Sequence, residues 1–386
     1  MNKYNEGSFT VQKKLLTFCG LNPSRNVYYK LYSFLVISLL WSYSIGLIPS
    51  FIQNETYDSL LENSPFFIAA TTVSFFYALL HVNKNGMYSL MDKLETGVFL
   101  PNMARGGTFE EDLLMKCVKV CKKVGICSII FASFPTPFTL LVVIGSEEEI
   151  LPFGNFPLYG TLLNYKMKVI IQFVIYVIVP TGYCAVILMY ITILFHILTH
   201  FKILQNALKH MEKTCKNLEP ETKWNSQLHC LREVIYYHNS IIEVAAELES
   251  LFNISVLLVF IGSVVFIIFA ASYGSLDAFL TFGYIRDALL LTATGFHITI
   301  LSYIGNEVTL ESEKVGVACS EINYVGENLK FQKAIILIIE RSQRPIRPTI
   351  GKLADLSLLT FVSILRGMVS YIIVLRSFRN SGVRGE

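Results

Sequence analysis

Two pairs of side chains in this sequence have the spacing of metal ligands on one turn of a helix. Cys117 and Cys121 lie four residues apart, and so do His196 and His200. Residues at that spacing share a helical face, and thiolates and imidazoles are the usual ligands of structural zinc. Neither pair has a further ligand close to it along the chain, so we expect no metal site. The histidines are more typical of a cytoplasmic membrane interface.

No other motif supports catalysis. The chain has no glycine-rich phosphate loop, no His-Glu-x-x-His sequence and no serine nucleophile elbow. Glu243 and Glu247 are one helical turn apart, but a glutamate pair on a charged helix normally faces solvent. We therefore expect neither an enzyme nor a cofactor.

Long apolar stretches dominate the chain instead. Hydrophobic residues make up 53% of the 386 positions, 16% are charged and the mean hydropathy is +0.51, whereas about 25% of an ordinary soluble domain is charged. Seven stretches reach or approach the roughly 20 residues with which an α-helix crosses a bilayer. Because lipid tolerates no unpaired backbone, the sequence predicts an all-α membrane protein with seven spans. The stretches are Leu31–Pro49, Pro65–Leu80, Val124–Ile144, Val169–Ile197, Leu251–Gly274, Phe279–Ile304 and Leu353–Leu375.

The distribution of basic residues predicts the orientation in the membrane. The N-terminal segment and the loops before the third, fifth and seventh stretches are rich in Lys and Arg, whereas residues 51–64 and 145–163 contain none. Cytoplasmic loops carry this excess, so the N-terminus is expected in the cytoplasm and the C-terminus outside. A G-protein-coupled receptor has the opposite orientation. Asn54 begins an Asn-Glu-Thr glycosylation sequon in the first outer loop, and no cysteine lies in an outer loop, as expected when only the exterior oxidises thiols.

Helical apolar stripes continue beyond the membrane after the fourth stretch and before the fifth and seventh. Leu204, Leu208 and Met211 form one of them. Stripes of this kind pack on one another, which predicts a cytoplasmic helical anchor. The last stripe meets Arg344-Pro345 and Arg347-Pro348, and a residue before proline is pushed out of the helical region. The last helix is therefore expected to be split, with its membrane half restarting after Thr349.

The C-terminal region resembles that of insect odorant receptors. Ser370-Tyr371, five residues and Ser377-Phe378 are similar to their Thr-Tyr, five apolar residues, Gln-Phe signature. The order of the motifs identifies the chain as a member of that family, although Ser377 replaces the glutamine and Arg376 an apolar residue. The long insertion that marks the shared co-receptor is absent before the fifth span, which indicates a ligand-tuned subunit. Further similar segments are Ile339–Pro345, Gly351-Lys352, Leu356-Ser357, Thr360-Phe361 and Leu151–Pro157.

This resemblance implies an odorant-gated, non-selective cation channel in the plasma membrane of a sensory neuron. Its partners would be a small volatile odorant, the odorant receptor co-receptor in a tetramer, and membrane lipid, with no nucleic acid. One receptor domain would cover 1–386. Within it, 31–201 would hold the ligand-binding spans, 202–350 the anchor with spans five and six, and 351–378 the pore helix. A gustatory-type chemoreceptor channel and a secondary transporter are the alternatives, although the chain shows no inverted repeat.

By the same resemblance, the odorant pocket lies in the outer half of the bundle. Proline kinks, such as one at Pro180, would open space there. Apolar walls with a few hydroxyls are typical of small-molecule sites, so we expect a mostly apolar ligand. The expected ligand-binding residues are Phe67, Thr71, Phe134, Phe138, Phe173, Tyr176, Tyr183, Phe279 and Tyr284.

The resemblance also assigns the pore. Val374 falls at the position of the hydrophobic gate and Ser377 at that of the selectivity glutamine, with Phe378 beside it. Steps of three and four residues place Ser370, Val374 and Ser377 or Phe378 on one helical face. Arg376 would lie nearer the outer mouth of the pore.

Overall fold

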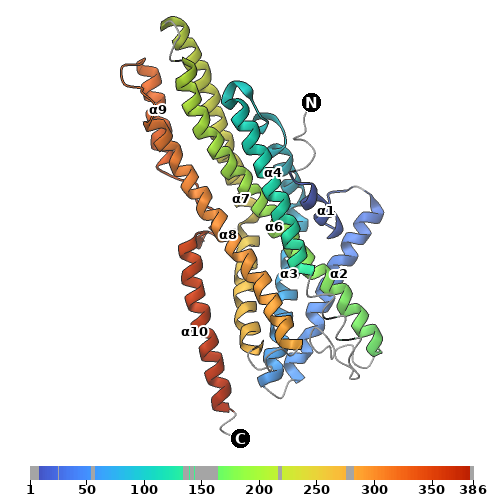
Figure 1. The fold of residues 1–386 in the computed structure, drawn as a ribbon. Coiled ribbons are helices and arrows are strands. Elements are labelled where there is room, and N and C mark those ends of the chain that lie inside the picture. The colour runs from blue at the N-terminus through green and yellow to red at the C-terminus, as the bar shows by residue number, and fades with distance from the viewer. Residues whose placement is uncertain are drawn as a thin grey trace.

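The computed structural model describes residues 8–24, 26–53, 57–133, 139, 143, 164–215, 220–274 and 282–382. Almost all of them are helical, and the long helices run side by side (Figure 1). The all-α membrane architecture predicted from the sequence is confirmed. The helices are α1 Thr10–Phe18, α2 Val27–Gln53, α3 Tyr57–Leu94, α4 Met103–Ser133, α6 Tyr165–Cys215, α7 Pro220–Gly274, α8 Phe282–Ser320, α9 Leu329–Ser342 and α10 Leu358–Gly382, with a 3₁₀ turn at Gly97–Phe99.

Within the described residues, six helices are long and apolar enough to cross a membrane: α2, α3, α6, α7, α8 and α10. They correspond to six of the seven apolar stretches found in the sequence. The third stretch, Val124–Ile144, coincides with α4 as far as Ser133. Most of its remainder lies outside the described residues.

Two of these helices are much longer than a membrane span. α6 has 51 residues and α7 has 55, which at 1.5 Å per residue gives each a length of about 80 Å. The hydrocarbon core is only about 30 Å thick, so roughly half of each helix projects beyond it. The projecting apolar stripes pack together in one buried core that includes Leu204 and Leu208 of α6, Val244 of α7, Val315 of α8 and Ile335 of α9.

The last helix is split, as predicted, but its second half begins later than expected. α9 ends at Ser342, and a two-stranded antiparallel hairpin, β1 Thr349–Ile350 and β2 Ala354–Asp355, precedes α10. The predicted restart after Thr349 is therefore wrong by about two helical turns. Ser357 explains the observed start, because its hydroxyl accepts a hydrogen bond from the Thr360 backbone N–H at 3.2 Å and so caps the helix.

A left-handed turn at Gly351 and Lys352 closes the hairpin, with φ of 64° and 57°. Only glycine adopts this region freely. A Cβ at Gly351 would also lie 2.7–2.9 Å from side-chain atoms of Leu257 on α7. The turn thus packs closely against α7. Because Gly351 and Lys352 have positive φ, the chain is not helical at this point.

α10 differs from the other membrane helices in how little of it is buried. Only 6% of its span is buried, against 67% of the span in α6. It stands at the edge of the bundle, and the C-terminus lies at the opposite end of the molecule from α9 (Figure 1). Leu359, Val369, Tyr371, Ile373 and Val374 are exposed along it.

Candidate functional site

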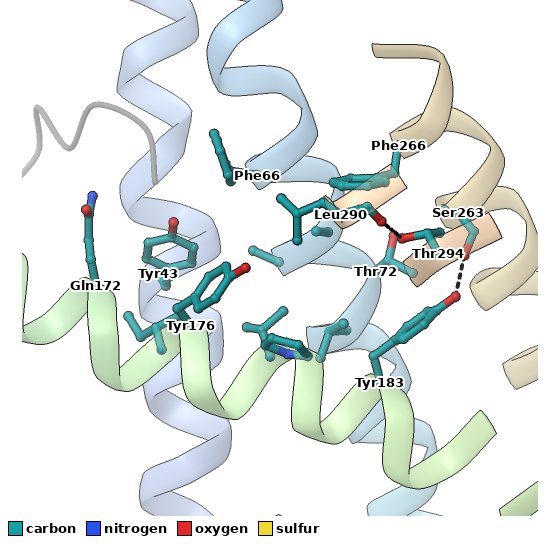
Figure 2. A pocket seen from close by; sticks show the side chains of 17 residues that line it. Tyr43, Phe66, Thr72, Gln172, Tyr176, Tyr183, Ser263, Phe266, Leu290 and Thr294 are labelled. Carbon is teal, nitrogen blue, oxygen red and sulfur yellow. Dashed lines mark hydrogen bonds between the residues drawn. The ribbon is translucent and has the colours of Figure 1, made fainter. Parts of the chain in front are cut away.

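A cavity of about 130 Å³ lies inside the bundle, between α2, α3, α6, α7 and α8 (Figure 2). It is lined by the first half of α3, and the charge pattern predicts that this end of the bundle faces the outside. Its walls are mainly aliphatic and aromatic, with hydroxyls and one amide among them. The lining residues are Tyr43, Phe66, Ala69, Ala70, Thr72, Val73, Gln172, Ile175, Tyr176, Val179, Pro180, Tyr183, Gly262, Ser263, Phe266, Leu290 and Thr294.

α6 supplies one continuous wall of this cavity. Gln172, Ile175, Tyr176, Val179 and Tyr183 recur at steps of three and four residues and so share a helical face. Pro180, inside the helix, lines the cavity as well. Proline has no N–H to bond the carbonyl four residues earlier, so the backbone of α6 is weakened at the level of Tyr176.

Three of the lining hydroxyls have hydrogen-bond partners within the protein. The Tyr183 and Ser263 hydroxyl oxygens lie 2.8 Å apart and join α6 to α7, and the Thr294 hydroxyl donates to the Leu290 carbonyl at 2.9 Å (Figure 2). Hydroxyls that are already paired are poor partners for a ligand. Shape and dispersion therefore dominate what this cavity can offer, with polar contacts added by the remaining lining groups.

Gly262 sets the distance between α3 and α7 at the cavity. A Cβ added there would lie 2.9 Å from the Cβ of Thr72, which is closer than side chains tolerate. The two helices can approach this far only because residue 262 has no side chain. The close approach of two walls of the cavity thus requires a residue that has no side chain.

A buried ion pair stands behind one wall. Arg286 Nε donates to Asp287 Oδ1 at 2.8 Å, and both residues are buried. The guanidinium also lies over the Phe66 ring, 5.1 Å from its centroid. Buried charges are normally paired, and the cation–π contact helps to fix the ring that lines the cavity.

The structure distributes the predicted ligand-binding residues unevenly. Tyr176 and Tyr183 line the cavity. Phe67 and Phe173 pack against the buried cluster beside it. Thr71 and Tyr284 are half-buried and are not among the lining residues. Phe134, Phe138 and Phe279 lie outside the described residues.

The predicted set consists of aromatic residues and one threonine, and it omits most of the wall. The periodicity of α6 could have added Gln172, Ile175 and Val179, which lie on the same face as Tyr176 and Tyr183. No comparable signal points to Tyr43 or Thr294, because only the packing of α2 and α8 brings them to the cavity.

The predicted pore residues lie on α10, with Val374, Arg376 and Ser377 exposed on the isolated subunit. Phe378 belongs to the same helix. The sequon residue Asn54 lies outside the described residues.

Comparison with known proteins agrees with this architecture. The profile of the family described as 7tm Odorant receptor matches residues 56–369. Odorant receptor 67a of Drosophila melanogaster is 24% identical over 181 residues, which are 47% of this chain and 44% of that protein. The chain matches less than half the length of each of its curated relatives in that fly.

Solved structures share the fold across almost the whole chain. The insect olfactory receptor OR5 from Machilis hrabei in complex with eugenol superposes with a TM-score of 0.82 at 18% identity, covering 98% of this chain and 100% of that one. A second structure of OR5 gives 0.80 at 19% identity, covering 94% and 96%. These neighbours are receptors and not enzymes. The sequence profile covers most of the chain, which therefore belongs to the odorant receptor family of insects.

Proposed function

We propose that this chain is the ligand-tuned subunit of an odorant-gated, non-selective cation channel, assembled as a tetramer with the shared co-receptor. Its site of action would be the plasma membrane of a sensory neuron. The observation that carries the proposal is α10, a helix of membrane length whose span is only 6% buried. A helix with so little packing inside its own subunit is suited to face other subunits or water around a central pore.

The cavity supports the proposal that the subunit binds an odorant. Its apolar walls and modest volume of about 130 Å³ suit a small, volatile, mostly apolar molecule with one or two polar atoms. The related OR5 was solved with eugenol, which is a molecule of this class. Gln172 and Tyr176 are the lining residues that we expect to make polar contacts.

The exposed face of α10 supports the proposal that the protein is part of an ion channel. Val374 is 47% exposed in the subunit, and in a tetramer its equivalents would form an apolar ring. A narrow apolar ring stops ions by dewetting without any charged barrier. Ser377 and Arg376, one turn or less further on, would then lie toward the outer mouth and influence which ions pass.

The test is whole-cell recording from cells that express the chain with the co-receptor, screened against volatile compounds. We expect inward cation current that needs both subunits and no substrate gradient. Tyr176→Ala should shift the half-maximal odorant concentration about tenfold or more while sparing current evoked by a co-receptor agonist. Tyr303→Ala is the matched control, because this tyrosine is half-exposed on α8 away from the cavity.

Two results would contradict the proposal. Flux that requires a substrate gradient would indicate a secondary transporter. Current that is independent of the co-receptor and responds to non-volatile tastants would indicate a gustatory-type channel.

A further inference from the structure

The metal-like spacings in the sequence acquire a third ligand in the fold. Cys117 and Cys121 lie one turn apart on α4, and α6 brings His196 against them. One ligand atom from each residue lies within 4.8 Å of the others, and the two sulfur atoms are 4.0 Å apart. His196 is 75 positions away from Cys121 along the chain, so proximity in sequence could not reveal it.

All three side chains are buried, with exposed fractions of 5% for Cys117, 1% for Cys121 and 3% for His196. Neither ring nitrogen of His196 has a hydrogen-bond partner among the described residues. Buried polar atoms are nearly always paired, so each exception asks for an explanation. An ion bound by the ring nitrogen nearer the two sulfur atoms would account for one of these two exceptions.

The geometry is close to that of a metal centre. Two thiolates on tetrahedral zinc, each about 2.3 Å from the ion, lie about 3.8 Å apart, which is near the 4.0 Å separation of the Cys117 and Cys121 sulfur atoms. The ligand nitrogen of His196 lies within 4.8 Å of both sulfur atoms. A side-chain movement of about 1 Å would bring it to the distance at which all three atoms bind one ion. Two sulfurs and one imidazole nitrogen are ligands that soft and borderline ions prefer.

Surrounding groups hold the imidazole in place. The Phe9 ring stacks on that of His196, with centroids 5.1 Å apart and planes 23° from parallel. One turn earlier on α6, Thr192 accepts a hydrogen bond from Gln12 at 2.6 Å. α1 therefore covers the site from the side, and the charge pattern places this region toward the cytoplasm, where thiols stay reduced.

We propose that Cys117, Cys121 and His196 bind one Zn²⁺ or Cu⁺ ion, which cross-links α4 to α6 at the side covered by α1. Both cysteines bind as thiolates, so each releases its proton to solvent when the ion enters. The fourth position of a zinc ion would be taken by water. This site is separate from the ligand cavity, and the proposal does not depend on the channel function.

The experiment uses the purified, reduced, full-length chain in detergent. Co²⁺ is added first as a spectroscopic probe, because thiolate ligands give an intense sulfur-to-cobalt charge-transfer band whose strength reports two sulfurs. Zn²⁺ and Cu⁺ are then titrated separately against competing chelators. We expect one equivalent of Zn²⁺ or Cu⁺ to bind, to displace Co²⁺ and to raise the unfolding temperature.

Variants assign the ligands. Cys117→Ser with Cys121→Ser should abolish the cobalt band, and His196→Gln should weaken metal binding at least tenfold. Cys127→Ser, on the same helix but exposed, and Cys319→Ser, buried elsewhere, are controls that should bind like the unmodified chain. The proposal is overturned if the unmodified chain binds none of these ions stoichiometrically, a result that does not depend on whether any variant folds. It is equally overturned if the double serine variant retains full binding.

Discussion

The hydroxyl of Tyr183 on α6 lies 2.8 Å from that of Ser263 on α7, at the wall of the cavity. This bond connects two helices that both continue beyond the membrane span. The same bond therefore joins the two helices and forms part of the cavity wall.

The first prediction concerns this pair. Ser263→Ala leaves a tyrosine hydroxyl without its serine partner, which costs about 1–3 kcal/mol when the group is buried. Tyr183→Phe removes the tyrosine hydroxyl instead. The loss of unfolding free energy in the double variant should be smaller than the sum of the losses in the two single variants by about 1 kcal/mol. Thermal unfolding of the four purified proteins measures this coupling. Strictly additive losses would show that the bond contributes nothing to stability.

The second prediction concerns Gly262. Gly262→Ala should destabilise the bundle by about 1–3 kcal/mol because the added methyl group overpacks the contact with Thr72. It should also weaken responses to odorants by changing the cavity. Gly295→Ala is the control, since a Cβ there meets no atom within 4 Å and alanine is about 0.5–1 kcal/mol better than glycine within a helix. Unfolding temperature and odorant dose–response distinguish the two variants, and equal behaviour of both would refute the role of Gly262.

The third prediction concerns orientation. Asn54 lies in a predicted outer loop and should carry a glycan. Enzymatic removal of glycans should therefore increase the gel mobility of the protein with the natural sequence and leave the mobility of the Asn54→Gln variant unchanged. The second sequon, Asn253-Ile254-Ser255, lies within α7 and should remain unmodified. An epitope at the C-terminus should be labelled on intact cells. Labelling only after permeabilisation would exclude the predicted orientation.

The fourth prediction concerns the gate on α10. Val374→Asn should raise the resting current of the co-expressed channel several-fold, because a polar ring lets water occupy a narrow pore. Val369→Asn provides the comparison, since it is exposed on the same helix but lies about 140° around the axis. Changes at Arg376 and Ser377 should shift the reversal potential in mixed ions. Unaltered resting current and reversal potential at all these positions would place the pore elsewhere.

The sequence predicts the membrane helices well because an apolar run of span length has few other stable environments. The boundaries are less predictable. The start of α10 depends on the hairpin at 349–355, which fits against Leu257 of α7 through Gly351, and this tertiary contact leaves no local pattern. The cavity wall likewise contains some residues that a local sequence pattern predicts and others that it does not. The periodicity of α6 marks its own face, whereas Ser263 and Thr294 reach the cavity only through helix packing.

The metal-like cluster shows the same limit for chemistry. The cysteine pair can be found from its spacing on one helix. The companion histidine cannot, because it belongs to another helix and is brought there by the crossing of α4 and α6.

The hairpin between α9 and α10 has a mechanical consequence. The chain from Gln343 to Ser357 contains no α-helix, so no i→i−4 hydrogen bond passes from one helix to the other. Glu249 of α7 binds the Thr349 backbone N–H at 3.3 Å and also contacts its hydroxyl, which pins the start of the hairpin. Because α9 and α10 share no helical hydrogen bond, a change in the tilt of α10 about this point would leave every hydrogen bond within α9 in place.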